Sequence, residues 1–99
     1  MERRDLILLG AGGHCISCID VIEAAKLFNI IGILDPNEPV GKLVCGYSVL
    51  GDDSLIAEYR KQNCVFFITV GQIKTNITRK LLYNLVKESD GELPVIVSP

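Results

Sequence analysis

The sequence predicts an α/β fold: a Rossmann-like, open, doubly wound and mainly parallel sheet in a single small domain over residues 1–99. Short apolar runs recur at 6–10, 29–35, 64–71 and 93–97. Most of them are continuous rather than alternating, as expected for strands buried on both faces of a parallel sheet. Polar-patterned segments of helical length separate the runs, and right-handed crossovers between such strands place helices on both faces of one sheet.

The first strand and helix are predicted from the run at 6–10 and the segment that follows it. A glycine cluster ends the run, and apolar side chains then recur at helical spacing on one stripe. The members of this stripe are Cys15, Cys18, Ile19, Ile22 and Ala25. The run at 29–35 then predicts the second strand.

The middle of the chain begins as a loop with two prolines and Gly41. A short strand is predicted near Tyr47–Leu50, and Asp52 or Asp53 can cap a helix that runs to about Gln62. After the strand at 64–71, Asn76 or Thr75 can cap a last helix that ends before Gly91. The run at 93–97 predicts the final strand.

Composition excludes several classes of partner. The net charge is −2 and no basic cluster is longer than Arg3-Arg4, so nucleic acid is not an expected partner. The longest early apolar run is too short for a secretory signal or a membrane span. We therefore expect a cytoplasmic protein whose four cysteines are reduced.

Ligands of doubly wound sheets lie at the carboxyl ends of the strands, where the winding direction reverses. The candidate binding residues at these ends are Gly10, Ala11, Gly12, Gly13 and His14 after the first strand, Asp35 and Pro36 after the second, and Gly71 and Gln72 after the third.

The glycine loop predicts a phosphate site. Free backbone N–H groups and the positive end of a helix dipole favour an anion there, and the missing β-carbon of Gly12 permits close approach. Asp35 closes the second strand, where a carboxylate can accept hydrogen bonds from a ribose or a base. The dinucleotide fingerprint is imperfect, because Cys15 stands where it requires a third glycine. A turn that only reverses the chain is the alternative.

The single histidine and the cysteines carry no predicted catalytic or metal site. His14 could contact a ligand or close the loop through backbone bonds. Cys15 and Cys18 form a C-x-x-C pair at a helix start, but both lie on the apolar stripe, so we expect core packing over redox or metal roles. Lys74 and Arg79 could meet a diphosphate or lie in solvent, and Asp20 is expected at the surface or as a tether to a neighbouring loop.

Taken in order, these residues resemble the N-terminal domain of bacterial sugar acyltransferases of the sialic-acid O-acetyltransferase and bacillosamine N-acetyltransferase type. The resemblance rests on "ILLGAGGHC", Asp20, "GILD", "GYSVLGDDSLI", "FITVGQ", Arg79 and "LPVIVSP". Cys15 departs from the glycine or alanine usual in the family, and Asp35-Pro36 stands where some members have two aspartates.

The resemblance implies that the domain binds a nucleotide-linked sugar, typically a UDP-sugar, or a related sugar acceptor. It further implies a following β-helix of hexapeptide repeats that forms a homotrimer, binds acetyl-CoA and carries the catalytic histidine. No such repeat is present in the 99 residues, so we expect no acyl transfer and no cofactor in this chain alone.

Two other functions remain open from the sequence. One is a stand-alone dinucleotide- or CoA-binding module, with Cys15 as a redox sensor. The other is an interaction scaffold in which the glycine loop is only structural.

Overall fold

The sheet of this protein has five strands in the order β3-β4-β2-β1-β5. The computed structural model describes residues 3–69 and 76–93, with the backbone alone at 13–14 and 76–79. The elements are β1 (Arg4–Leu9), α1 (Gly13–Ala25), β2 (Phe28–Leu34), β3 (Leu43–Val44), β4 (Tyr47–Gly51), the 3₁₀ helix η1 (Asp53–Leu55), α2 (Ile56–Lys61), β5 (Val65–Ile68) and α3 (Asn76–Glu88).

Strand β1 lies inside the sheet and pairs in parallel with β2 on one side and β5 on the other. Strand β4 continues the parallel sheet beyond β2, and only β3 runs antiparallel, as the partner of β4. The chain therefore winds from β1 through β2 to β4, and then crosses to β5 on the other side of β1. This reversal between β1 and β5 is the place where a doubly wound sheet binds its ligand.

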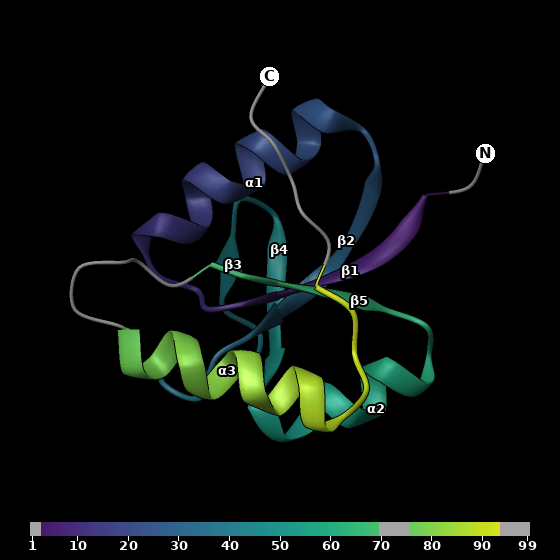
Figure 1. Ribbon diagram of the computed structural model, residues 1–99. Helices are drawn as coiled ribbons and strands as arrows, with labels where there is room; N and C mark the ends of the chain where they lie inside the picture. The colour runs from purple at the N-terminus through teal and green to yellow at the C-terminus, as the bar shows by residue number, and fades with distance from the viewer. Residues whose placement is uncertain (1–2, 70–75, 94–99) are drawn as a thin grey trace.

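Helices cover both faces of the sheet, as predicted (Figure 1). Leu6 and Leu8 of β1 pack on the face covered by α1, with Cys15, Ile19 and Ile22. The alternate residues of β1 pack on the face covered by α2 and α3; this second cluster includes Ile7, Leu9, Ile56, Phe66, Leu82 and Val86. Side chains of successive strand residues point to opposite faces, so β1 supplies both cores.

The segment after α3 returns to the sheet alongside β5 (Figure 1). The Phe66 amide donates a hydrogen bond of 2.9 Å to the Glu92 carbonyl, and Arg4 forms an exposed ion pair of 2.7 Å with the Glu92 side chain. The strand predicted at 93–97 lies outside the described residues except for Leu93, which is not in a strand.

Two elements differ from the sequence-based expectation. The helix predicted from Asp52 or Asp53 to Gln62 is a 3₁₀ turn followed by the short α2. Strand β3, which was not predicted, forms a tight hairpin with β4 through Cys45 and Gly46, both of which have positive φ. No helix in the described ranges is both long and apolar enough to cross a membrane.

Candidate functional site

The carboxyl ends of β1, β2 and β5 bring three chain segments together. Gly10 follows β1, Asp35 follows β2 and Thr69 follows β5. The Gly10 amide donates to the Leu34 carbonyl at 3.0 Å, and the Thr69 amide donates to the Leu9 carbonyl at 3.0 Å. The sheet pairing thus extends to the start of the glycine loop and fixes it between its two neighbours.

Two glycines of the loop are needed for different reasons. Gly10 is buried and has φ of 122°, a conformation that side-chain-bearing residues rarely adopt. Gly12 has an ordinary φ of −75° and is exposed, and a β-carbon added there would meet no atom within 4 Å. Gly10 is therefore required by the backbone, whereas Gly12 leaves open space in front of the loop.

Helix α1 begins at Gly13, so the positive end of its dipole lies at the glycine loop. Its N-cap residue is Gly12, no side-chain cap hydrogen bond forms, and the first turn holds no acidic residue. The Cys15 amide is satisfied by the Gly12 carbonyl at 2.9 Å. Amides at an uncapped helix start favour an anion, so this geometry suits a phosphate group.

The Asp35 carboxylate lies beside the loop and is engaged by the protein's own backbone. Oδ2 accepts a hydrogen bond from the Ala11 amide at 2.8 Å, and Oδ1 accepts one from the Asn37 amide at 2.8 Å. Each oxygen of a carboxylate can accept a further bond. A contact between Asp35 and a ribose or base stays a prediction, but its bonds within the chain give Asp35 a role in the free protein.

An open hollow of about 380 Å³ lies next to Asp35, between the ends of β2 and β4. It is lined by Asp35, Pro36, Glu38, Val40, Gly51, Asp52, Ser54 and Leu55. Its carboxylates are paired within the chain, since Glu38 accepts from Lys42 and Asp52 accepts from Ser54. Bonds from the Ser54 hydroxyl and amide lower the pKa of Asp52. Apolar side chains between satisfied polar groups suit a flat, partly polar ligand group.

Thr69 is a site residue that the sequence reasoning missed. Its side chain is 1% exposed, and its hydroxyl donates to the Gly10 carbonyl. One signal was present in the sequence, because Thr69 is a polar residue within the apolar run at 64–71.

Cys15 packs in the core, as predicted. It is fully buried with Ile19 and Ile22, and burial raises the pKa of its thiol to about 11. Thiolates are the reactive form of cysteine, so this protonated and buried thiol is unsuited to redox sensing. Cys18 packs partly buried against the same cluster, and among the described residues no group of three His, Cys, Asp or Glu side chains could hold a metal ion.

Several predicted site residues are not placed by the structure. Gly71, Gln72 and Lys74 lie outside the described residues. His14 and Arg79 belong to α1 and α3, but only their backbone is described. Their contact with a ligand remains a prediction.

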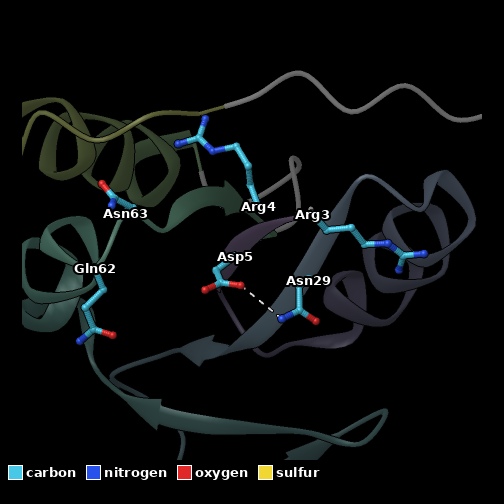
Figure 2. Close-up of a pocket in the computed structure, with 6 residues that line it drawn as sticks. All are labelled: Arg3, Arg4, Asp5, Asn29, Gln62 and Asn63. Atoms are coloured by element: carbon cyan, nitrogen blue, oxygen red, sulfur yellow. Dashed lines mark hydrogen bonds between the residues drawn. The ribbon is translucent and has the colours of Figure 1, made fainter. Parts of the chain in front are cut away.

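A larger open hollow of about 680 Å³ lies at the opposite edge of the sheet, near the amino ends of β1 and β2 (Figure 2). Its lining residues are Arg3, Arg4, Asp5, Asn29, Gln62 and Asn63. The two arginine side chains point away from each other in Figure 2, and Arg4 is already paired with Glu92. No cationic groups converge there, so we place the candidate ligand site at the carboxyl edge despite the smaller hollow.

Comparison with known proteins agrees with this geometry. The family model of the PglD N-terminal domain matches residues 5–86. The chain belongs to the PglD N-terminal domain family. This confirms the resemblance to the N-terminal domain of sugar acyltransferases, and the matched range contains the glycine loop, Asp35 and Thr69. No curated protein sequence matches the chain significantly.

Solved structures share the fold of this PglD-type domain. The H141N mutant of perosamine N-acetyltransferase from Caulobacter crescentus, in complex with CoA and GDP-perosamine, has a TM-score of 0.83 at 24% identity over 96% of this chain and 43% of its own. The acetyltransferase domain of PglB from Neisseria gonorrhoeae, in complex with acetyl coenzyme A, has a TM-score of 0.82 at 25% identity over 99% of this chain and 45% of its own.

A protein of another kind has the same fold at lower similarity. The Rex-family repressor RSP has a TM-score of 0.70 at 15% identity over 99% of this chain and 49% of its own, which shows the fold alone. The chain spans less than half the length of each of these three proteins.

Proposed function

We propose that this chain is the substrate-binding N-terminal domain of a sugar acetyltransferase and that it binds a nucleotide-linked sugar at the carboxyl edge of its sheet. The uncapped start of α1 behind the open position of Gly12 is the observation that carries the proposal. Membership of the PglD N-terminal domain family supports it, as do the solved acetyltransferases of the same fold.

In this proposal the diphosphate lies over the glycine loop and contacts the amides of Gly12 and Gly13, with His14, Gly71 and Gln72 as further contacts. The amides act as neutral donors, and the helix dipole adds a favourable potential within the first turn. The base or ribose lies in the hollow beside Asp35 and Pro36. The sugar then projects away from the domain toward the groups that perform acyl transfer.

Acyl transfer itself we assign to a further part of the parent enzyme, with acetyl-CoA as the donor. Both solved acetyltransferases were captured with CoA or acetyl coenzyme A, and the chain covers less than half of each. No catalytic residue is proposed within the described part of this chain. We further propose that the parent enzyme is a homotrimer and that it is cytoplasmic. The second part agrees with the finding that the cysteines that the structure describes form no disulfide.

The nature of the nucleotide is decided by titration. UDP-N-acetylglucosamine and GDP-mannose are added to the ¹⁵N-labelled chain, with NAD and CoA as competitors of other classes. We expect one of the two sugar nucleotides to shift the amide signals of Gly12, Gly13 and Asp35, because the diphosphate meets the loop there. Unchanged spectra with both at millimolar concentration would contradict the proposal, and shifts with NAD or CoA alone would favour a dinucleotide- or CoA-binding module.

A pair of variants separates binding at the loop from general effects. Gly12→Val is expected to fold normally, since the space at its β-carbon is open, and to weaken nucleotide binding at least tenfold by filling the phosphate position. Ser17→Val places the same side chain on the exposed side of α1 and should bind as the wild type does. Equal affinity of both variants would indicate that the glycine loop is only structural.

A further inference from the structure

The peptide group between Gly10 and Ala11 is held at both ends by side chains from the two strands that flank β1. The Thr69 hydroxyl, after β5, donates to the Gly10 carbonyl. The Asp35 carboxylate, after β2, accepts the Ala11 amide at 2.8 Å. One peptide plane is therefore fixed by a donor on one side and an acceptor on the other.

The two side chains are themselves held in place. The Thr69 amide donates to the Leu9 carbonyl, so this residue continues the pairing of β5 with β1. Its side chain is buried. Asp35 is held by the Asn37 amide through its other oxygen. The Asp35 side chain therefore cannot move without giving up a second partner, and the Thr69 side chain is confined by its burial.

We infer that Thr69 and Asp35 are positioning residues, which orient the Gly10–Ala11 peptide and thereby aim the amides of Gly12 and Gly13 at the ligand. The dihedral angles that lead to Gly12 start from this peptide plane, so fixing it narrows the range of loop conformations before any ligand arrives. Preorganisation of this kind lowers the entropy lost on binding. The ligand part of this inference rests on the proposed function.

The same geometry divides the loop amides into two groups. The Ala11 amide is occupied by Asp35 and is unavailable to a phosphate, whereas the N-cap at Gly12 is open. A negative charge on Asp35 next to a diphosphate is unfavourable in isolation, but here the carboxylate is satisfied by two backbone donors. Its charge therefore stabilises the loop.

Hydrogen exchange of the free, full 99-residue chain tests the clamp directly. Asp35→Ala should accelerate exchange of the Ala11 amide at least tenfold, because the amide loses its acceptor. Asp52→Ala is the matched control, since Asp52 also accepts a backbone amide at the end of a neighbouring strand but does not touch the loop. Equal exchange of the Ala11 amide in the wild type and Asp35→Ala would overturn the inference.

The affinity for whichever of UDP-N-acetylglucosamine and GDP-mannose binds the wild type tests the positioning role. Thr69→Val keeps the shape but removes the hydroxyl, and we expect affinity to fall about threefold to tenfold, the effect of one lost hydrogen bond. Thr69→Ser restores the donor and should restore most of the affinity. Equal affinity of Thr69→Val and the wild type would overturn the positioning role.

The two proposals fail in different ways. If neither sugar nucleotide binds the wild type, the proposed function fails, yet the exchange of the Ala11 amide still reports whether the clamp exists. If a nucleotide binds but Thr69→Val binds it as tightly as the wild type does, the clamp does not serve the ligand and the positioning role is wrong.

Discussion

Two glycines of the loop have different structural roles: one adopts a backbone conformation that other residues disfavour, and the other leaves space in front of the loop. Gly10 takes a positive φ at a buried position, where its carbonyl and amide are both bonded. Gly12 takes a φ open to any residue and faces empty space. Glycine is thus required at position 10 for its backbone conformation and at position 12 for its lack of a side chain.

This difference predicts that the same substitution costs stability at Gly10 but not at Gly12. Gly10→Ala should lower the free energy of unfolding by about 1–3 kcal/mol, since alanine is strained at this φ. Gly12→Ala should leave it nearly unchanged because its β-carbon meets no atom. Urea unfolding of the two variants measures both values, and a similar loss in each would show that the φ of Gly10 does not govern the cost.

Cys15 makes stability depend on pH in the alkaline range. Burial raises the pKa of its thiol to about 11, so the folded state keeps the proton where the unfolded chain begins to lose it. The stabilisation from Cys15 is then complete below about pH 9 and falls as the pH approaches 11. The stability gap between the wild type and Cys15→Ala should narrow over that interval.

Chemical denaturation at pH 8, 9, 10 and 11 measures this gap, and Ile19→Ala, in the same buried cluster, supplies the control. The gap between the wild type and Ile19→Ala should not narrow in the same way, because the isoleucine side chain has no proton to lose. A Cys15 gap that is constant up to pH 11 would show that folding does not favour its protonated form.

Among the elements, the end of α3 shows how the helix turns back to the sheet. Asp90 takes the left-handed conformation with φ of 60°, and its carbonyl accepts Arg60 Nε at 2.7 Å. The next residue, Gly91, has no room for a side chain, since an added β-carbon would lie 2.8 Å from Val86 Cγ1 and 3.1 Å from the Val86 carbonyl. The left-handed backbone is therefore the constraint at Asp90, and the lack of room for a β-carbon is the constraint at Gly91.

Substitutions at these two positions should change stability in opposite directions. Asp90→Gly relieves the left-handed strain and should stabilise the chain by up to about 1 kcal/mol. Among the described residues, the substitution removes an exposed ion pair between Asp90 and Arg60, which contributes little. Gly91→Ala overpacks the helix end and should cost about 1–3 kcal/mol. Thermal unfolding ranks both against the wild type, and a destabilised Asp90→Gly would contradict this account.

Elements could be predicted from the sequence where the signal was local and long. The continuous apolar run of β1 and the stripe on α1 meet this condition, and both elements lie where they were expected. Strand β3 has only two residues, and its turn uses Cys45-Gly46 in place of the Asn-Gly typical of such hairpins. Neither feature gives a recognisable pattern.

Only the part of the candidate site that is contiguous in the sequence could be predicted. The glycine loop is contiguous, so its place after β1 could be read directly. The bond from Thr69 to Gly10 spans 59 positions and the bond from Ala11 to Asp35 spans 24, so both depend on strand register. Register follows from packing of the whole sheet, which a single sequence does not display.

At the scale of the whole molecule, stability comes from two cores on opposite faces of one sheet. Ile7 and Leu8 are neighbours on β1 and both are fully buried, yet they belong to different clusters. A sheet covered on one face only would leave one of them in water.

Because both faces of the sheet are covered, truncating a β1 side chain on either face should lower the free energy of unfolding by a similar amount. Ile7→Ala and Leu8→Ala should each lower the free energy of unfolding by about 2–5 kcal/mol, the range for removing a buried aliphatic side chain. Equilibrium unfolding with a single probe of the fold measures both values. A loss of less than 1 kcal/mol in either variant would mean that its face of the sheet is not packed as described.

The return of the chain past β5 also determines how copies of this domain can associate. On the outer side of β5, the Phe66 amide donates a hydrogen bond to the Glu92 carbonyl. The opposite border of the sheet is β3, which has only two residues. Open borders of a sheet invite strands from other molecules, and short or covered borders discourage them. Strand addition from another molecule at these two borders is therefore disfavoured.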